Sequence, residues 1–186
     1  MGPQAETVLD LATRRRIVEH VQDNPGLHLR ALAEALAMPV STLEYHCYHL
    51  SKHGHLSVRE EGAFKAFYPA EGMDRRDKDI LYLVRHDGPR RICTHLLLNP
   101  GATPADLKPA TGLSGPTLSF HLNKLRKAEL VREEPAGRTK RLFVVDPERV
   151  AGVLVTYRRS FVDDAVDRFS EAWLALVPPT KPPETA

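Results

Sequence analysis

Apolar residues in the first third of the chain follow a helical period and then an alternating one. Spacings of three and four predict helices over Thr13–Asp23, around Leu32 and over Val40–His53. Two short β-like runs follow, Leu56–Arg59 and Ala63–Tyr68, separated by a charged loop that contains glycine. Helix, helix, turn, helix and hairpin in this order predict a winged helix-turn-helix module.

The same order of elements returns 75 residues later. Arg15–Leu56 and Arg90–Val131 align without a gap, and 14 of the 42 aligned positions are identical. A unit repeated only twice indicates duplicated globular modules, because repeat arrays need about three or more units to be stable. The counterparts in the second copy are helices over Gly88–Leu98, around Leu107 and over Gly115–Ala128, and β-like runs over Leu130–Glu133 and Arg141–Val145.

Local start and stop signals separate these elements. Asn24-Pro25-Gly26 and Asn99-Pro100-Gly101 each end the opening helix, because proline cannot continue a helix and glycine takes a positive φ at low cost. Ser114 is expected to cap the third helix of the second copy. A leading helix is predicted before each copy, at Ala5–Leu11 and at Asp74–His86.

These patterns predict a mainly α protein with small β-hairpins, arranged as two tandem winged helix-turn-helix domains plus a long C-terminal helix. Asp146-Pro147 resembles a helix start, and apolar residues from Val150 to Leu176 continue at helical spacing. The predicted boundaries are 5–72 and 73–147 for the two domains, 148–177 for a packing or dimerisation helix, and 178–186 for a disordered, proline-rich tail.

The net charge is only +2, but the charges are distributed unevenly. Residues 1–72 hold 7 Lys/Arg against 9 Asp/Glu, whereas residues 73–147 hold 14 against 9. Lys and Arg contacts to phosphate supply most of the sequence-independent energy of binding to nucleic acid. A polyanion is therefore expected to interact mainly with the second copy.

Several classes of protein are not expected. No stretch approaches the roughly 18 apolar residues of a membrane helix, and the first residues lack an apolar signal core, so we expect a cytoplasmic protein. Motifs for a phosphate-binding loop, a nucleophile elbow or a zinc hydrolase are absent, so we expect no enzyme and no cofactor. Cys47 and Cys93 occupy unmatched positions of the repeat and are expected to be buried thiols.

Both copies resemble the ArsR/SmtB-type winged-helix regulators. The resemblance lies in Leu11–Ile17, Asn24-Pro25-Gly26, Leu32–Leu36 and Ser41–His46, and in the second copy in Gly88–Ile92, Asn99-Pro100-Gly101, Thr117–Leu122 and Leu125–Val131. It implies binding to double-stranded DNA, with the third helix of each module in a major groove and the hairpin loop near the backbone or minor groove. Members of this family usually bind DNA as dimers of one-module chains.

Two modules in one chain could act as a covalent pseudo-dimer, and a homodimer through the C-terminal helix is also possible. The metal sites of the family are not expected here. Arg30–Leu36 has no cysteine, and the aspartates Asp163, Asp164 and Asp167 have no histidine beside them.

The exposed flanks of the third helices and the second hairpin loop supply the candidate DNA contacts, because hydroxyls and cations read or position a duplex. The family often has arginine where this chain has Tyr45 and Phe120, which removes the commonest bidentate reader of guanine. A solvated helix face is the alternative explanation for the same residues. The candidates are Ser41, Thr42, Tyr45, His49, Lys52 and Lys65 in the first copy, and Thr117, Ser119, Phe120, Lys124, Lys127, Arg138, Lys140 and Arg141 in the second.

Histidines repeat at two places in the modules. His46 and His121 are expected to be buried beneath the hairpins, and His20 and His95 are expected to lie in the cores.

A cluster on the third helix of the first copy has two further interpretations. His46, His49 and His53 with Cys47 could by spacing hold a soft metal ion, but a single helix rarely completes four ligands, and no metal site is predicted. His49 and His53 could instead make a proton-dependent contact with DNA phosphate.

The sequence thus predicts a double-stranded DNA-binding transcriptional regulator. An architectural DNA-binding protein of low sequence specificity is one alternative, and a winged-helix scaffold for protein interactions is another. Glu60-Glu61 and Glu133-Glu134 lie on the two hairpins, where they would repel phosphate. For the first module in particular this raises a second hypothesis, that it serves as a protein-docking surface.

Overall fold

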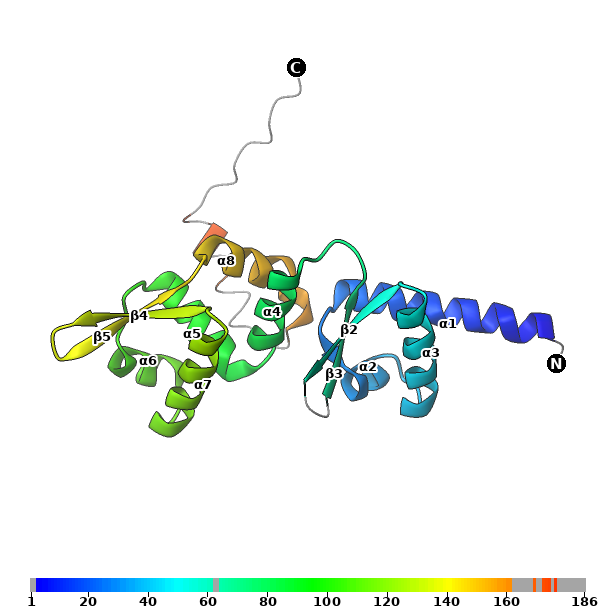
Figure 1. Cartoon of the computed structure of the whole chain (residues 1–186), viewed down its shortest axis with the longest axis horizontal. Helices are drawn as coiled ribbons and strands as arrows, with labels where there is room; N and C mark the ends of the chain where they lie inside the picture. Colours follow the sequence, from blue (N-terminus) through cyan, green and yellow to red (C-terminus); the bar gives the residue numbers. More distant parts are fainter. Residues whose placement is uncertain (1–2, 62–63, 162–168, 170–171, 175, 177–186) are drawn as a thin grey trace, which may run out of the picture. The chain divides into compact units, whose positions relative to one another are not determined.

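The computed structural model describes residues 3–61, 64–161, 169, 172–174 and 176. The chain divides into two compact units, Met1–Tyr82 and Leu83–Ala186. Each unit contains a helix-turn-helix followed by a β-hairpin (Figure 1). The prediction of a mainly α protein with small β-hairpins and two tandem helix-turn-helix modules is confirmed.

The first unit begins with one long helix, α1 (Pro3–Asp23), in place of the two that the sequence predicts. It continues with β1 (Leu27–His28), α2 (Leu29–Ala35), α3 (Val40–Lys52), β2 (Leu56–Glu61), β3 (Phe64–Pro69) and most of α4 (Arg75–Val84). The three strands form an antiparallel sheet in the order β1-β3-β2. The core lies where α1, α2 and α3 meet the sheet, and its fully enclosed side chains include Ile17, Val21, Leu32 and Leu43.

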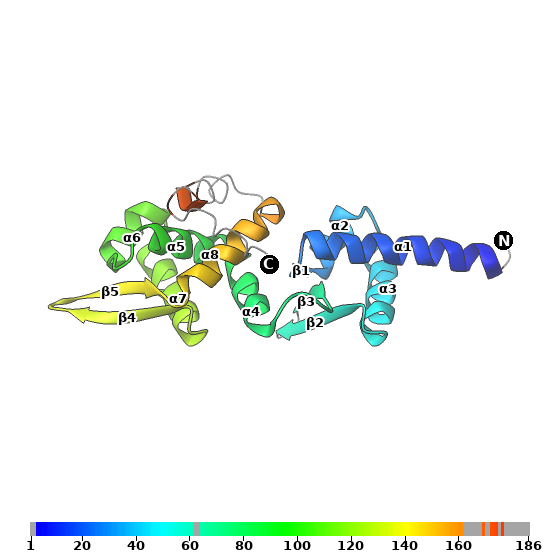
Figure 2. The same cartoon turned by 90° about the horizontal axis from the view of Figure 1, so that it is seen from above.

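The second unit repeats this arrangement with α5 (Asp87–Leu98), α6 (Pro104–Thr111), α7 (Gly115–Lys127), β4 (Val131–Ala136) and β5 (Thr139–Val144). The helix α8 (Pro147–Thr156) and a short 3-10 helix (Arg158–Ser160) follow. The β4–β5 hairpin extends away from the helices of its unit in both views (Figure 1, Figure 2). Both hairpins are longer than predicted. The pair Glu60↔Lys65 in the first hairpin and the pair Pro135↔Lys140 in the second are separated by 75 residues, the same offset that relates the helices.

The predicted stop and cap signals lie at the ends of helices in the structure. Both Asn-Pro-Gly tripeptides follow the opening helices, and Gly26 and Gly101 have φ values of 81° and 85°. Ser114 caps α7 by accepting a hydrogen bond from the Thr117 backbone N–H. Asp146 likewise caps α8, and Pro147 occupies its first turn.

The leading and opening helices join in the first unit but stay separate in the second, and a proline accounts for the difference. Pro89 has no N–H for the carbonyl of Arg85, and its ring would collide with that carbonyl in a continuous helix. The buried side chain of Arg90 instead donates to the carbonyls of Val84 and Arg85, each at 3.0 Å. Arg15, the repeat counterpart of Arg90, stays exposed on the unbroken α1.

The prediction of one helix over 148–177 is wrong. The helix α8 ends at Thr156, with Val150, Ala151, Val153 and Leu154 buried in its own unit. The chain then forms a 3-10 turn in which the Ser160 hydroxyl donates to the Tyr157 carbonyl at 2.7 Å, and such local side-chain bonds compete with helix continuation. The predicted tail 178–186, and most of 162–177, lie outside the described residues.

The division between the units falls after Tyr82, later in the chain than the predicted boundary at residue 72. The reason is that a hydrogen bond and an ion pair connect α4 to β2 of the first unit. Lys78 donates to Ser57 Oγ at 2.9 Å, and Arg59 forms an ion pair with Asp79. Residues 75–82 of a helix that the sequence assigns to the second copy therefore belong to the first unit.

Candidate nucleic-acid interface

The third helix of the second unit buries one face and exposes the other. Leu118, Leu122 and Leu125 recur at helical spacing and are at most 6% exposed. Phe120 is 67% exposed. The remaining candidates on this helix are Thr117, Ser119 and Lys127, which are exposed, and Lys124, which is half-buried.

The second hairpin places its cations on a narrow tip. Gly137 takes a φ of 63°, which allows the short turn between β4 and β5. Arg138 in this turn and Lys140 and Arg141 on β5 are all exposed. At the base of the hairpin the Arg132 guanidinium stacks over the Phe143 ring, 4.6 Å from its centroid.

A carboxylate joins the third helix to the hairpin in this unit. Glu133 accepts hydrogen bonds from Lys140 Nζ at 2.7 Å and from Arg126 Nη1 at 2.6 Å. The Lys140 ammonium, with the Arg126 guanidinium beside it, holds the pKa of Glu133 below its usual range despite partial burial. Arg126 was not among the predicted site residues, although its position between Lys124 and Lys127 in the last turn of the helix was a usable signal.

The first unit places its candidates in a similar way but with a different charge. Ser41, Thr42 and Lys52 are exposed on α3, Tyr45 is 57% exposed, and His49 is half-buried. Lys65 on β3 is exposed and lies 3.6 Å from the Glu60 carboxylate. Lys65 is thus paired with an acid, as its counterpart Lys140 is, but the first hairpin has alanine at the positions equivalent to Arg138 and Arg141.

The two equivalent surfaces differ in net charge. Residues 40–69, from α3 through the first hairpin, hold three Lys/Arg and three Asp/Glu. Residues 115–144, their counterparts, hold seven Lys/Arg and three Asp/Glu. The basic character of the second copy is thus concentrated on the elements that carry the candidate contacts.

Three of the four repeated histidines are less buried than the sequence predicts. His46 is buried as predicted, with Nε2 3.9 Å from a carboxylate oxygen of Asp10. His121 is only half-buried, as are His20 and His95, because these side chains lie at the border between the apolar stripe and solvent.

The cluster around His49 does not assemble as a metal site. The rings of His49 and His53 are 4.3 Å apart, but the described residues contain no group of three or more ligands placed to share an ion. Desolvation and the nearby Arg14 guanidinium lower the pKa of His49, which works against a proton-dependent contact with phosphate. Burial raises the pKa of both Cys47 and Cys93 to about 12, so these thiols stay protonated and inert at neutral pH.

Comparison with known proteins agrees with this architecture. Residues 11–81 match a family model described as an N-terminal HTH domain, and residues 86–134 match one described as a helix-turn-helix domain. The chain therefore carries two helix-turn-helix domains in tandem. These matches do not separate the ArsR/SmtB type from other helix-turn-helix regulators, so that assignment stays a prediction.

A curated relative has 36% identity to this chain over 132 residues. It is described as an uncharacterized HTH-type transcriptional regulator, MJ1398, of Methanocaldococcus jannaschii. The match covers 71% of this chain but only 33% of the relative, so the chain spans about a third of its length. A crystal structure of the DIP2311 protein from Corynebacterium diphtheriae covers 71% of this chain and 26% of its own, at 15% identity and a TM-score of 0.27, which is too low to inform the fold.

None of the described helices combines the length and the apolar character that crossing a bilayer requires.

Proposed function

We propose that this protein is a transcriptional regulator that binds double-stranded DNA mainly through its second module. The observation that carries the proposal is the excess of cations on α7 and the β4–β5 hairpin. Residues 115–144 hold seven Lys/Arg and only three Asp/Glu. Phosphate contacts by such side chains supply most of the affinity for a duplex. The two helix-turn-helix matches and the name of the curated relative support the same class of function.

In this proposal the exposed face of α7 enters a major groove. Thr117, Ser119 and Lys124 lie on that face, together with Phe120, whose ring can contact a thymine methyl group. Arg138 and Arg141 on the hairpin then contact the phosphate backbone. The first module makes the weaker contact through Ser41, Thr42, Tyr45, His49, Lys52 and Lys65.

An architectural role with little sequence preference is the second candidate. It is favoured by the aromatic residues Tyr45 and Phe120, which are 57% and 67% exposed at positions where the resembled family often has arginine. Neither side chain can make the bidentate contact that identifies guanine.

The proposal is tested by measuring duplex affinity by fluorescence anisotropy across a salt series. Phosphate engagement predicts that log K falls linearly as log salt rises, and an affinity that does not change with salt would contradict it. Competition with random-sequence duplex then separates a regulator from an architectural protein. A complete lack of binding at low salt would favour the protein-interaction scaffold.

A further inference from the structure

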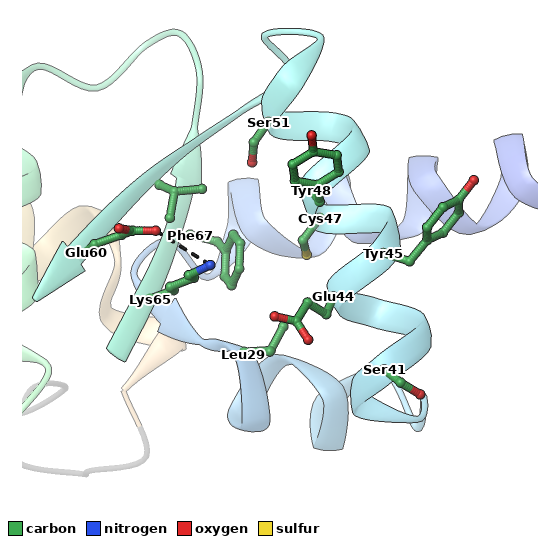
Figure 3. A pocket seen from close by; sticks show the side chains of 11 residues that line it. Leu29, Ser41, Glu44, Tyr45, Cys47, Tyr48, Ser51, Glu60, Lys65 and Phe67 are labelled. Atoms are coloured by element: carbon green, nitrogen blue, oxygen red, sulfur yellow. Dashed lines mark ion pairs between the residues drawn. The ribbon is translucent and has the colours of Figure 1, made fainter. Parts of the chain in front are cut away.

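A groove lies between α3 and the hairpin of the first unit, on the surface equivalent to the candidate interface of the second. It has a volume of about 460 Å³, which is within the range of sites for small organic molecules. Its lining combines apolar residues with two carboxylates. Figure 3 shows Phe67 and Lys65 pointing from β3 toward α3, and Glu44 pointing from α3 toward Leu29.

The repeat explains why this groove is open. In the second unit, Arg126, Glu133 and Lys140 join the third helix to the hairpin by ion pairs at 2.6 and 2.7 Å. Their counterparts at the same offset are Ser51, Val58 and Lys65. Two of the three charged side chains are replaced by a small hydroxyl and an aliphatic group, so this network of ion pairs does not fill the space between helix and hairpin here.

The charges of the groove favour a positive occupant over DNA. Glu44 makes no hydrogen bond or ion pair with any described residue, and it replaces the neutral Ser119 of the second unit. Glu60 lies 3.6 Å from Lys65, so the two carboxylates and the ammonium of the lining sum to one negative charge. A second hollow of about 810 Å³, which Arg30 also lines, shares Leu29, Glu44 and Lys65 with the groove, so Glu44 carries the negative charge where the two meet.

The floor and walls of the groove are suited to an apolar cation. Phe67 and Tyr48 line it, and the faces of aromatic rings attract cations. Cys47 is also part of the lining, but its pKa of about 12 keeps the thiol neutral, so it contributes apolar surface and no covalent chemistry.

We propose that the groove between α3 and the β2–β3 hairpin binds a small, largely apolar organic cation, with Glu44 as its counter-ion and Phe67 and Tyr48 against its apolar part. This site goes beyond the proposed function and does not depend on duplex binding. Ser41, Tyr45 and Lys65 line this groove and are also candidate duplex contacts, so a bound cation would displace the weaker duplex contact of the first module and leave DNA binding to the second.

Isothermal titration calorimetry of the full chain with tetraphenylphosphonium tests the proposal, because tetraphenylborate has the same shape and the opposite charge. One phosphonium is expected to bind per chain, and the borate is expected to bind at least about tenfold more weakly. Equal affinity for the two ions, or no binding of the phosphonium, would overturn the proposal.

Two sets of variants locate the site. Glu44→Gln should weaken phosphonium binding about tenfold, whereas Glu34→Gln, which removes an exposed carboxylate of α2 from the same unit, should leave it unchanged. Ser51→Arg combined with Val58→Glu rebuilds the ion-pair network of the second unit and should abolish binding. Thermal unfolding confirms that each variant folds. Binding that survives in the double variant, or that responds equally to the two glutamate variants, would place the cation elsewhere and overturn the assignment.

Discussion

The imidazole ring of His121 lies directly against the backbone of Gly88. A Cβ atom at position 88 would overlap Nε2 and Cδ2 of that ring, so the first turn of α5 and the middle of α7 approach closely only because residue 88 has no side chain. The first unit has Thr13 at the equivalent position, and there His46 is placed with Nε2 3.9 Å from Asp10. The same repeated histidine is therefore held in two different ways.

Gly88→Ala is expected to destabilise the second unit by about 1–3 kcal/mol, because the added methyl group forces His121 out of its place. The measurement is the denaturant-induced unfolding of the full chain, and the penalty should largely disappear in a His121→Ala background. Gly152→Ala is the control, since a Cβ there meets no atom within 4 Å and alanine is favoured over glycine in a helix by about 0.5–1 kcal/mol. A loss of stability from Gly152→Ala as large as that from Gly88→Ala would contradict the steric argument.

The pKa of His121 makes the second unit sensitive to acid. Burial, and then the Lys124 ammonium, lower this pKa below its usual range, against a smaller opposing effect of Asp87. Since the unfolded chain binds the proton more readily than the folded one, stability is complete above the ordinary histidine pKa of about 6.5 and declines as the pH falls below it. Hydrogen exchange of α5 and α7 amides between about pH 8 and about pH 5.5 should show this decline, and His121→Gln should reduce it. An NMR titration that gives His121 a pKa above about 6.5 would refute the prediction.

The hairpin of the second unit is expected to contribute more to duplex binding than that of the first. Replacing Arg138, Lys140 and Arg141 together by alanine should lower the slope of log K against log salt by about one for each phosphate that the variant no longer neutralises. The comparison is Lys65→Ala, because Lys65 corresponds to Lys140 in the repeat, whereas Arg138 and Arg141 stand where the first copy has Ala63 and Ala66. A reduction from Lys65→Ala as large as that from the triple variant would contradict the proposed asymmetry.

Glu133 is expected to weaken duplex binding, because it engages Lys140 and Arg126 on the cationic surface. Glu133→Gln should raise affinity at low salt and steepen the salt dependence by up to about one counterion. Glu148→Gln removes one exposed carboxylate from α8 of the same unit and serves as the control for net charge. If both variants raise the affinity equally, the change in net charge causes the effect, and the loss of the ion pairs of Lys140 and Arg126 does not.

The sequence predicted the helices and hairpins because their signals are local. Periodic leucines, the Asn-Pro-Gly stops and the Ser114 cap each depend on a few neighbouring residues. The two-residue strand β1 (Leu27–His28) gave no such signal, because it is defined only by its pairing with Phe67 and Ala66 on β3. The end of α8 at Thr156 was missed for a similar reason, since the apolar spacing that continues beyond it does not reveal the turn at Ser160.

The candidate interface was predicted in part. Every candidate lies at least partly exposed on the third helices and hairpins, as the helical period implies, and their contact with DNA stays a prediction. Glu133 was expected only to repel phosphate, and its ion pairs were not predicted, because they depend on distances between a helix and a hairpin that no spacing pattern encodes. The groove of the first unit was not predicted. It depends on Val58 standing at the position equivalent to Glu133, and an aliphatic residue on a strand does not indicate a groove beside that strand.

The two Asn-Pro-Gly tripeptides do more than end a helix. The backbone N–H of Gly26 donates to the Phe67 carbonyl at 2.6 Å, and that of Gly101 donates to the Leu142 carbonyl at 2.9 Å. The residue that permits the chain to turn also secures the returning strand of each hairpin, about 40 residues further along the chain. A side chain at either glycine would therefore misplace the hairpin as well as the helix end, so these positions link local chain geometry to the orientation of the surface that each module presents.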